Sequence, residues 1–184
     1  MVKNIRSEKG ELTEFYTKDD AQSHGFLIRK SSKNVVVFVH GMDGNFYRSS
    51  PYRIKDGFIK KGYSAFVTNN RGHDLVAKIQ FGTGKNTNRK IIGTSIEKFE
   101  DSIYDTQAAI DTITKLGFKN IILAGHSTGC QKSVYYLSKT MDKRVKGLIL
   151  LSPTDDYNYF KKLLGPKHKK LVTLAQRQVR AGKG

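Results

Sequence analysis

The segment Gly125–Gly129 carries the pattern Gly-x-Ser-x-Gly, with Ser127 at its centre. A serine hydroxyl is a weak nucleophile, so an enzyme that uses one holds it on an exposed, strained turn, where small neighbours leave room for a base to reach the Oγ atom. Gly125 and Gly129 supply that room, and the segment lies between a predicted strand and a predicted helix. The pattern predicts Ser127 as a nucleophile. The alternative is a glycine-rich turn whose serine has no chemical role.

Two backbone N–H groups are expected to stabilise the negative charge that such an attack creates. Thr128 opens the predicted helix after the serine, so its N–H and the positive end of the helix dipole point toward a developing oxyanion. The second donor is the N–H of Met42, in the glycine-rich loop His40–Gly44 that follows the apolar run Val35–Val39. His40 is predicted to be a buried histidine that fixes this loop, not a base. The alternative is that the loop is an ordinary connection from a strand to a helix.

Apolar runs alternate with helical periods along the chain, which predicts a wound α/β domain. The spacing of Thr94 and Glu97 is that of a capping box, so a helix is predicted to begin there and to end at Gly117. The stretch 69–93 is polar and has no period, so it is predicted to be a loop. The predicted strands are 11–18, 24–30, 35–39, 63–68, 119–124 and 145–151, and the other predicted helices are 51–61 and 127–139, the latter with Val134 and Leu137 on one side.

The composition excludes several classes of protein. With 38% hydrophobic residues, 17 glycines and 3 prolines among 184 residues, the chain is neither collagen-like nor of low complexity, and it can form a core. Its apolar runs are strand-sized, so no membrane span or signal peptide is predicted. The single cysteine, Cys130, cannot form an intrachain disulfide or a cysteine-rich metal site, and it is predicted to pack as a small hydrophobe. These features favour a cytoplasmic protein.

The chain is strongly basic, with 33 Lys and Arg residues against 16 Asp and Glu residues and a formal net charge of +17. Ten of the basic residues lie in 45–96, and eight lie in 157–184, which has no acidic residue. Such regions can bind nucleic acid or an anionic membrane, but these lack interleaved aromatic residues and a recognition-helix pattern. Nucleic acid is therefore not the expected partner. The other interpretations are a solvated basic surface and balance by an acidic segment elsewhere in the protein.

Five segments together resemble the α/β-hydrolase superfamily, and more closely its small esterase-like or serine-aminopeptidase-like branch. They are VVVFVHGMDGN (Val35–Asn45), TNNRGHD (Thr68–Asp74), FEDSIYD (Phe99–Asp105), IILAGHSTGC (Ile121–Cys130) and LILLSPTDD (Leu148–Asp156). The resemblance implies a mostly parallel sheet with helices on both faces, Ser127 as the nucleophile and the N–H groups of Met42 and Thr128 as the oxyanion hole. It also implies a structural role for Arg71, and it requires no cofactor or metal.

The chain departs from this superfamily in the residues that would activate the serine. In these hydrolases the chain order is Ser, then Asp or Glu, then His. The acids after Ser127 are Asp142, Asp155 and Asp156, and the only histidine after them is His168, in a basic segment with no strand to return it to the serine. Asp155 or Asp156 is the better placed candidate for the acid, and the base is expected to lie beyond residue 184 and not at His168.

The chain is accordingly expected to be the N-terminal portion of a longer hydrolase that lacks the C-terminal strands of the fold. Residues 1–156 would form part of the core, and 157–184 the start of a helical cap or a basic tail. The predicted function is a serine hydrolase that cleaves an ester or related acyl bond of a small molecule through an acyl-enzyme on Ser127, with residues 1–184 alone inactive. The alternatives are a non-catalytic binding module of the same fold and, third, a protein that binds nucleic acid or an anionic membrane.

Overall fold

The structure is a computed structural model that describes residues 7–30, 33–48 and 50–183. It divides into two units, Met1–Pro153 and Thr154–Gly184, which we call the core unit and the C-terminal unit. The core unit contains the Gly-x-Ser-x-Gly pattern and the His40–Gly44 loop, together with every strand that the sequence predicts.

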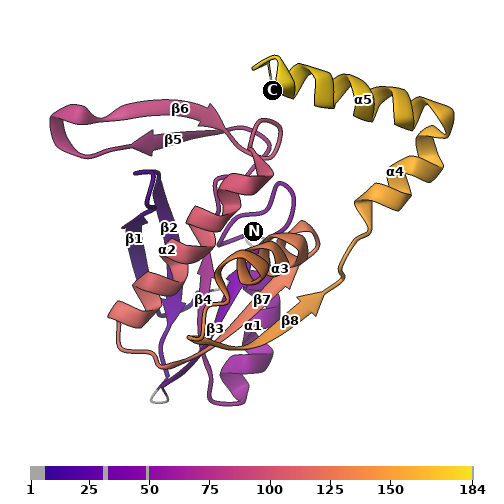
Figure 1. The fold of residues 1–184 in the computed structure, drawn as a ribbon. Helices are drawn as coiled ribbons and strands as arrows, with labels where there is room; N and C mark the ends of the chain where they lie inside the picture. Colours follow the sequence, from indigo (N-terminus) through magenta and orange to yellow (C-terminus); the bar gives the residue numbers. More distant parts are fainter. Residues whose placement is uncertain (1–6, 31–32, 49, 184) are drawn as a thin grey trace, which may run out of the picture. The chain divides into compact units, whose positions relative to one another are not determined.

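A six-stranded sheet runs through the core unit in the order β1-β2-β4-β3-β7-β8 (Figure 1). The pairs β3/β4, β3/β7 and β7/β8 are parallel, whereas β1/β2 and β2/β4 are antiparallel. The strands are β1 (Glu11–Tyr16), β2 (Gln22–Ile28), β3 (Asn34–Val39), β4 (Ser64–Thr68), β7 (Asn120–His126) and β8 (Val145–Leu151). The predicted strands are therefore confirmed, with boundaries shifted by at most two residues at either end.

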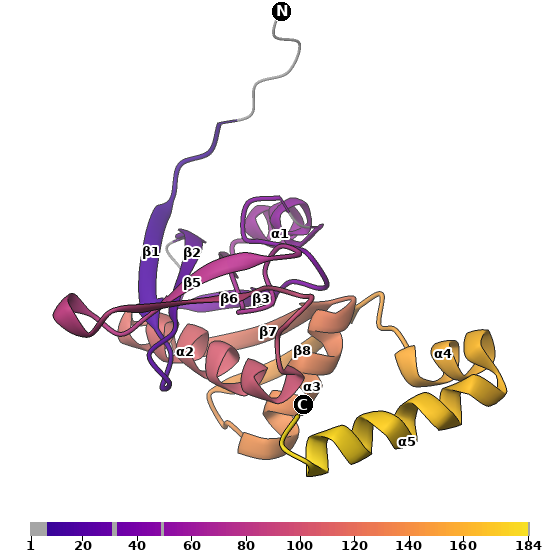
Figure 2. The ribbon, with the colours of Figure 1, turned by 90° about the horizontal axis from the view of Figure 1, so that it is seen from above.

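Helices cover both faces of this sheet, as Figure 2 shows from above. The helix α1 (Ser50–Lys60) packs on one face, against Val36 and Phe38 of β3. The helices α2 (Ser102–Lys115) and α3 (Thr128–Thr140) pack on the other, against Val35, Val37 and Val39. Because successive side chains of a strand point to opposite faces, a strand buried on both sides must be apolar throughout, which explains the unbroken run in β3.

The prediction of a loop over 69–93 is wrong, because this stretch contains a β-hairpin. Its strands are β5 (Ala77–Phe81) and β6 (Asn88–Ile92), paired antiparallel and joined through a short 3-10 turn. Ala77 and Ile79 are buried against Ala21 in a small cluster, while the side chains of β6 are mostly exposed. The alternation of apolar and polar residues from Ala77 to Phe81 has the period of a strand, but its polar residues and glycine-rich turn are equally typical of a loop.

The predicted start of α2 is also wrong. Thr94 and Glu97 do not cap the helix, which begins at Ser102 after a short 3-10 turn over Phe99–Asp101. The Thr94 hydroxyl instead donates to the Gly72 carbonyl at 2.6 Å, and the Glu97 carboxylate pairs with a buried lysine. Long-range partners have replaced the local ones, which a spacing rule cannot detect. The predicted end of the helix at Gly117 is confirmed, since this residue has a φ of +92°.

The apolar side predicted for α3 differs from the buried one. Val134 is 44% exposed, whereas Tyr136 is fully buried and Leu137 packs against the larger core cluster. The buried face also includes Lys132 and Ser133, two residues that a hydrophobic pattern does not select. Polar partners within the core therefore set the orientation of α3 together with its apolar residues.

Arg71, which follows β4, is enclosed by carboxylates, in agreement with the structural role predicted for it. Its guanidinium lies 2.9 Å from Asp19, 3.2 Å from Asp101 and 3.1 Å from Asp105, and its side chain is 3% exposed. The cluster ties the loop after β4 to the β1–β2 turn and to the start of α2, and so holds together the edge of the sheet where the site lies.

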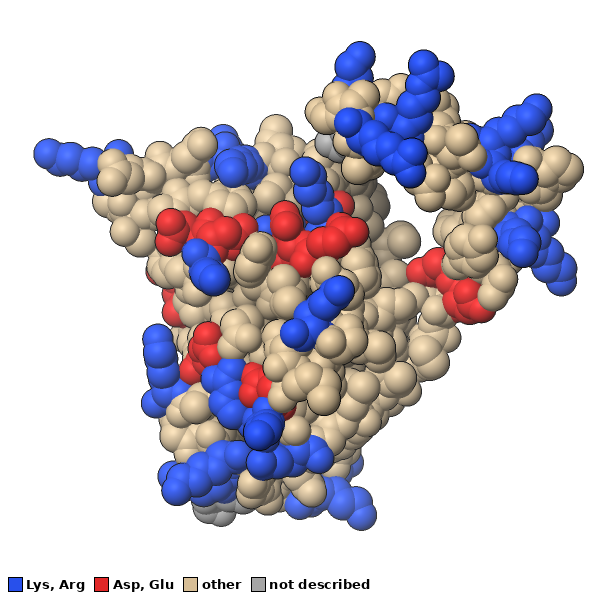
Figure 3. Space-filling view, viewed as in Figure 1, with Lys and Arg blue, Asp and Glu red and all other residues tan. Residues whose placement is uncertain are grey.

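The C-terminal unit consists of α4 (Asp156–Leu164) and α5 (Pro166–Arg180). Asp155 caps α4, since its carboxylate accepts a hydrogen bond from the N–H of Asn158 at 3.1 Å. Figure 3 shows Lys and Arg side chains along these helices, whereas basic and acidic side chains are interspersed over the core unit on the face drawn. Among the residues that the structure describes, no helix combines the length and apolar character that crossing a bilayer requires.

Candidate active site

Ser127 lies at a sharp turn between β7 and α3. Its backbone has a φ of 53° and a ψ of −127°, a conformation that residues with a side chain rarely adopt. The end of the neighbouring strand holds the turn, because the N–H of Ser127 donates to the carbonyl of Leu151 at 3.0 Å. Thr128 is the first residue of α3, so its N–H has no acceptor within the helix.

The two glycines of the Gly-x-Ser-x-Gly pattern let three backbone segments meet at this turn. A Cβ at Gly125 would overlap the carbonyl oxygen of Gly129 and would lie 2.7 Å from the Cα of Cys130. A Cβ at Gly129 would overlap the carbonyl oxygen of Val39 and would lie 2.7 Å from that of His40. The backbone met at Gly125 belongs to α3 and that met at Gly129 belongs to the end of β3, so neither can move without displacing a helix or a strand, and both positions exclude a side chain for steric reasons.

We expect Gly129→Ala to destabilise the protein by more than about 2 kcal/mol, because the added methyl group meets the backbone of β3. The matched control is Gly57→Ala, at an exposed position within α1 where an added Cβ has nothing within 4 Å. That change should raise stability by roughly 0.5–1 kcal/mol, the usual gain from replacing glycine inside a helix. Urea unfolding measures the change in the free energy of unfolding for both variants. A Gly129→Ala protein as stable as the wild type would contradict the close approach of β3 to Gly129.

The His40–Gly44 loop passes directly beside the serine. A Cβ at Gly41 would lie 2.7 Å from the Cβ of Ser127 and 3.2 Å from its Oγ, so only glycine fits here. The carbonyl of Gly41 is turned away from the serine, since it accepts hydrogen bonds from Nδ1 of His40 at 2.8 Å and from the N–H of Gly44 at 3.3 Å. In a trans peptide the N–H points opposite to the C=O. The N–H of Met42 is therefore directed away from His40.

His40 is fully buried beneath this loop, as the sequence predicts. Its Nε2 accepts from the N–H of Asn70 at 3.2 Å, so the proton of the neutral ring lies on Nδ1, which bonds the Gly41 carbonyl. Burial lowers the pKa of His40 to about 3, despite the hydrogen bond to Gly41, which acts in the opposite direction. His40 is accordingly a neutral residue that holds the loop, and no proton acceptor for the serine.

This buried histidine predicts a pH dependence of stability. The unfolded chain protonates His40 as the pH falls through its ordinary pKa of 6.5, whereas the folded protein does not do so until about pH 3. The unfolded state therefore binds more protons in this window, and the free energy of unfolding decreases as the pH falls through it. Between pH 7 and 5 the loss should be about 2 kcal/mol. Urea unfolding at pH 7 and pH 5 measures this loss of stability. His40→Gln should remove most of the pH dependence, whereas the control His126→Asn should keep it. If His40→Gln kept the same pH dependence as the wild type, His40 would not be its source.

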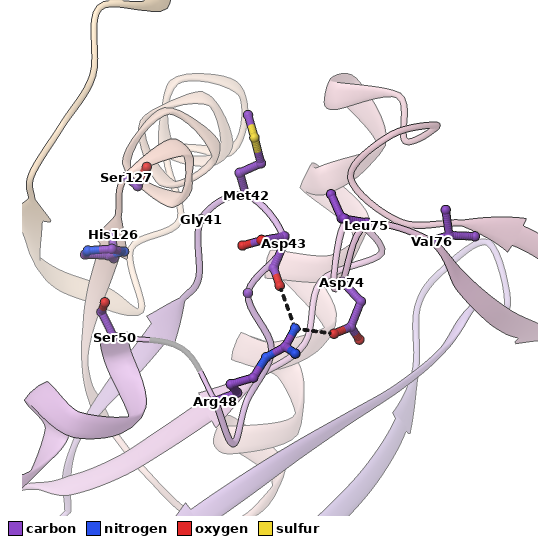
Figure 4. A pocket seen from close by; sticks show the side chains of 11 residues that line it. Gly41, Met42, Asp43, Arg48, Ser50, Asp74, Leu75, Val76, His126 and Ser127 are labelled. Atoms are coloured by element: carbon purple, nitrogen blue, oxygen red, sulfur yellow. Dashed lines mark hydrogen bonds and ion pairs between the residues drawn. The ribbon is translucent and has the colours of Figure 1, made fainter.

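A cavity of about 740 Å³ opens over the serine. Ser127 and His126 lie on one of its sides, the His40–Gly44 loop crosses it, and Leu75 and Val76 lie on the far side (Figure 4). The lining residues are Gly41, Met42, Asp43, Gly44, Arg48, Ser50, Asp74, Leu75, Val76, His126 and Ser127. The cavity thus brings the predicted nucleophile and the residue of one predicted donor to the same space.

A compensated pair of charges lines this cavity. The guanidinium of Arg48 contacts a carboxylate oxygen of Asp74 at 2.9 Å and the carbonyl of Asp43 at 3.4 Å (Figure 4). Burial alone would raise the pKa of Asp74, but hydrogen bonds from His73 and Asn45 and the charge of Arg48 lower it below its ordinary value. Asp74 is therefore ionised and partnered, and the cavity presents apolar and polar walls to a ligand.

Within the described residues of the core unit, the structure does not bring a histidine from another segment to Ser127. His40 is buried under the loop, His73 bonds Asp74 at 2.8 Å, and His24 lies 3.6 Å from Glu14. In the C-terminal unit, the ring of His168 packs against Tyr157 at 5.2 Å, and Asp155 caps α4. Over the described ranges, no group of three or more His, Cys, Asp or Glu side chains is arranged to hold a metal ion.

Several residues support the site although no sequence pattern assigns this role to them. Asn70, Glu97 and Lys132 form hydrogen bonds behind the His40–Gly44 loop, but each belongs to a different segment of the chain. Cys130, just past the serine, is buried as predicted, and its thiol donates to the carbonyl of Gly125 at 3.2 Å. Burial raises the pKa of this thiol, so it is a packing residue and not a second nucleophile.

Comparison with solved structures identifies the fold. An esterase of Pyrococcus furiosus, Pf2001, is 19% identical with a TM-score of 0.62, over 84% of this chain and 57% of the esterase. The α/β hydrolase GrgF from a Penicillium species is 17% identical with a TM-score of 0.66, over 94% and 54%. The esterase RhEst1 from a Rhodococcus species is 17% identical with a TM-score of 0.55, over 77% and 46%. The chain has the α/β-hydrolase fold and spans about half the length of these proteins.

Comparison at the level of sequence gives a family. A search of curated proteins found no significant match. The profile of the family described as "Protein of unknown function (DUF1749)" matches residues 4–184, which is nearly the whole chain. A match of this extent includes both the sheet and the turn that carries Ser127, and the chain belongs to the DUF1749 family.

Proposed function

We propose that the protein is a serine hydrolase that cleaves a carboxylic ester, or a related acyl bond, through an acyl-enzyme on Ser127. The observation that carries the proposal is the turn itself: Ser127 has a φ of 53° between β7 and α3, and the glycine-rich loop runs so close beside it that a Cβ at Gly41 would lie 3.2 Å from Oγ. A turn of this kind costs free energy and persists where the chemistry of the side chain needs it. The esterases among the similar structures support the same reaction class.

The reaction would proceed in two steps. Oγ of Ser127 attacks the acyl carbon while a base takes its proton, and the carbonyl oxygen becomes an oxyanion that accepts hydrogen bonds from the N–H groups of Met42 and Thr128. Collapse of this intermediate breaks the bond to the alcohol, which leaves with the proton. Water then attacks the acyl-enzyme in the same way and releases the acid.

The base in this proposal is a histidine supplied from outside the described core unit. His24, His40 and His73 have other partners, and His126, the residue directly before the nucleophile, belongs to the turn and is not proposed as its base. We propose that the base comes from a part of the protein that follows residue 184 and not from His168. The acid that orients it is Asp155 or Asp156, or a residue of that following part. Residues 1–184 alone are therefore expected to hydrolyse esters poorly although they contain the nucleophile.

The substrate that we propose is a small acyl compound. The cavity has a volume of about 740 Å³, within the range of small-molecule sites, and it combines apolar side chains with a few polar ones. We also propose that this hydrolase acts in the cytoplasm. Its single cysteine is a free, buried thiol, and a reducing compartment keeps thiols in this form.

A fluorophosphonate probe tests the proposal directly. The probe reacts with activated serines, so the intact protein should be labelled, and peptide mapping should place the label on Ser127. Competition by short-chain esters such as p-nitrophenyl acetate and butyrate should reduce the labelling. A folded, intact protein that takes no label and hydrolyses none of these esters would instead be a non-catalytic binding module of the same fold.

A further inference from the structure

A buried ion pair lies behind the His40–Gly44 loop, and the proposed acyl transfer does not use it. The ammonium of Lys132, on α3, lies 2.7 Å from both carboxylate oxygens of Glu97. The Lys132 side chain is 2% exposed and that of Glu97 is 13% exposed. Removing two charges from water costs free energy that their attraction often fails to recover, so apolar residues of similar volume would stabilise the fold as well or better. Stability alone does not explain this pair.

A chain of hydrogen bonds leads from the ion pair to the loop. Lys132 donates to Oδ1 of Asn70 at 3.0 Å. Asn70 holds His40 at two points, because its backbone N–H donates to Nε2 at 3.2 Å and its side-chain amide donates to the His40 carbonyl at 3.3 Å. Nδ1 of His40 in turn holds the carbonyl of Gly41 at 2.8 Å. The chain ends at the peptide group that carries the N–H of Met42.

The segment that supplies the carboxylate also holds the loop at a second point. The hydroxyl of Thr94 accepts from the N–H of Asp43 at 2.9 Å and donates to the carbonyl of Gly72 at 2.6 Å. Gly72 makes room for the ion pair, since a Cβ there would overlap the carboxylate of Glu97. Thr94 and Glu97, whose spacing resembles a capping box, are thus both connected to the loop and not to the helix.

We infer that the buried Lys132–Glu97 pair is a positioning device for the N–H of Met42. The pair acts through Asn70 and His40, and it touches neither the substrate nor the reacting atoms. The inference rests on the proposed function in one respect: kcat responds to the pair only if the N–H of Met42 is an oxyanion donor. An oxyanion hole stabilises the transition state because its N–H donors already point toward the oxyanion position before the charge develops. A rigid, buried hydrogen-bond network holds the donors in that orientation.

The charge of Lys132 has a second effect on His40. A nearby cation disfavours the protonated imidazole, so Lys132 adds to the effect of burial in lowering the pKa of this ring. The neutral ring with its proton on Nδ1 is the form that can accept from Asn70 and donate to Gly41 at the same time. The ion pair therefore supports both the position of the ring and its neutral form, while the partners at Asn70 and Gly41 fix the tautomer.

The test removes both charges at once. In Lys132→Met combined with Glu97→Leu no unpaired charge is left behind, so the melting temperature should stay within a few degrees of the wild type. The value of kcat for ester hydrolysis should fall roughly tenfold while KM stays within about twofold, because the donor is still present but is no longer held. If the ion pair only stabilised the fold, its removal would change the melting temperature but would not lower kcat selectively over KM.

The chain offers a matched control. Lys55, on α1, is also fully buried and is paired with Glu8 at 2.8 Å and Asp56 at 2.9 Å. Lys55→Met should leave kcat unchanged, whatever its effect on the melting temperature. A second variant, Asn70→Asp, provides an independent test. It has the same shape, keeps the acceptor for Lys132 and keeps the backbone N–H that bonds Nε2 of His40, but it loses the side-chain N–H donated to the His40 carbonyl and should also lower kcat.

A spectroscopic measurement tests the inference without catalysis. In ¹⁵N NMR spectra of the double variant, the Met42 amide signal should move and the ring nitrogens of His40 should show a mixture of tautomers, while Lys55→Met leaves both unchanged. Unchanged kcat together with unchanged Met42 and His40 signals in the double variant would overturn the inference. If Ser127→Ala retained full hydrolysis, the proposed function would fail, and the NMR result alone would decide the inference.

Discussion

Replacing Ser127 with alanine is expected to lower the rate of short-chain ester hydrolysis by roughly 10⁴-fold or more and to abolish labelling by a fluorophosphonate. The oxygen removed is the atom that forms the acyl-enzyme, so no other group can take over its step. The fold should be unaffected, because alanine adopts the φ of 53° at the same cost as serine and the N–H bonded to Leu151 remains. Circular dichroism and the melting temperature of the variant check this point.

The matched control is Ser138→Ala, since Ser138 is an exposed serine on α3 that does not line the cavity. This variant should keep both labelling and hydrolysis. His168→Ala tests the position of the base. The intact protein should keep its activity, because the base is expected to follow residue 184, and a loss comparable to that of Ser127→Ala would instead assign the base to His168. Labelling of Ser127→Ala at the wild-type rate would contradict the role of Ser127.

The central part of the fold could be predicted because its signals are local. The run Val35–Val39 can only be a strand buried on both faces, and β7 and β8 follow the same rule. Gly117 ends α2 by a backbone conformation that glycine adopts readily, so a single residue in the sequence predicts where the helix ends. Ser127 could be located for the same reason, since the glycines that the turn requires are its near neighbours in sequence.

The hairpin β5–β6 and the start of α2 could not be predicted in this way. The hairpin is held by Ala21, more than fifty residues before it, and β6 has too few apolar residues to show a strand period. A spacing rule misplaces the start of α2 because Glu97 pairs with Lys132, thirty-five residues later, and not with the helix backbone. Local spacing rules assume local partners, and these residues have distant ones.

The same limit applies to the residues that support the site. His40 could be predicted as a buried residue that fixes its loop, because it lies between an apolar strand and a glycine-rich turn. Its partner Asn70 lies on the loop after another strand, and only the parallel pairing of β3 with β4 brings the two together. The supporting network can therefore be recognised only in the three-dimensional structure, whereas the nucleophile can be recognised from the sequence.

Replacing Met42 with proline is expected to lower kcat by roughly 100-fold or more, because proline has no N–H and one of the two oxyanion donors is lost. KM should change little, since the donor binds the oxyanion more strongly than the carbonyl of the bound substrate. Met42→Ala keeps the N–H and removes only a side chain that is 59% exposed, so its effect on kcat should be mild.

A change of one atom makes the same test without the proline ring. An amide-to-ester substitution between Gly41 and Met42 replaces the N–H by an oxygen and leaves the side chain and the Gly41 carbonyl in place. Because that carbonyl is still held by His40 and Gly44, the loop should keep its path while the donor is absent. The loss in kcat should match that of Met42→Pro. If the ester-containing protein were as active as Met42→Ala, the loop beside Ser127 would contribute no donor, and the oxyanion would have to be held by Thr128 and groups outside the core unit.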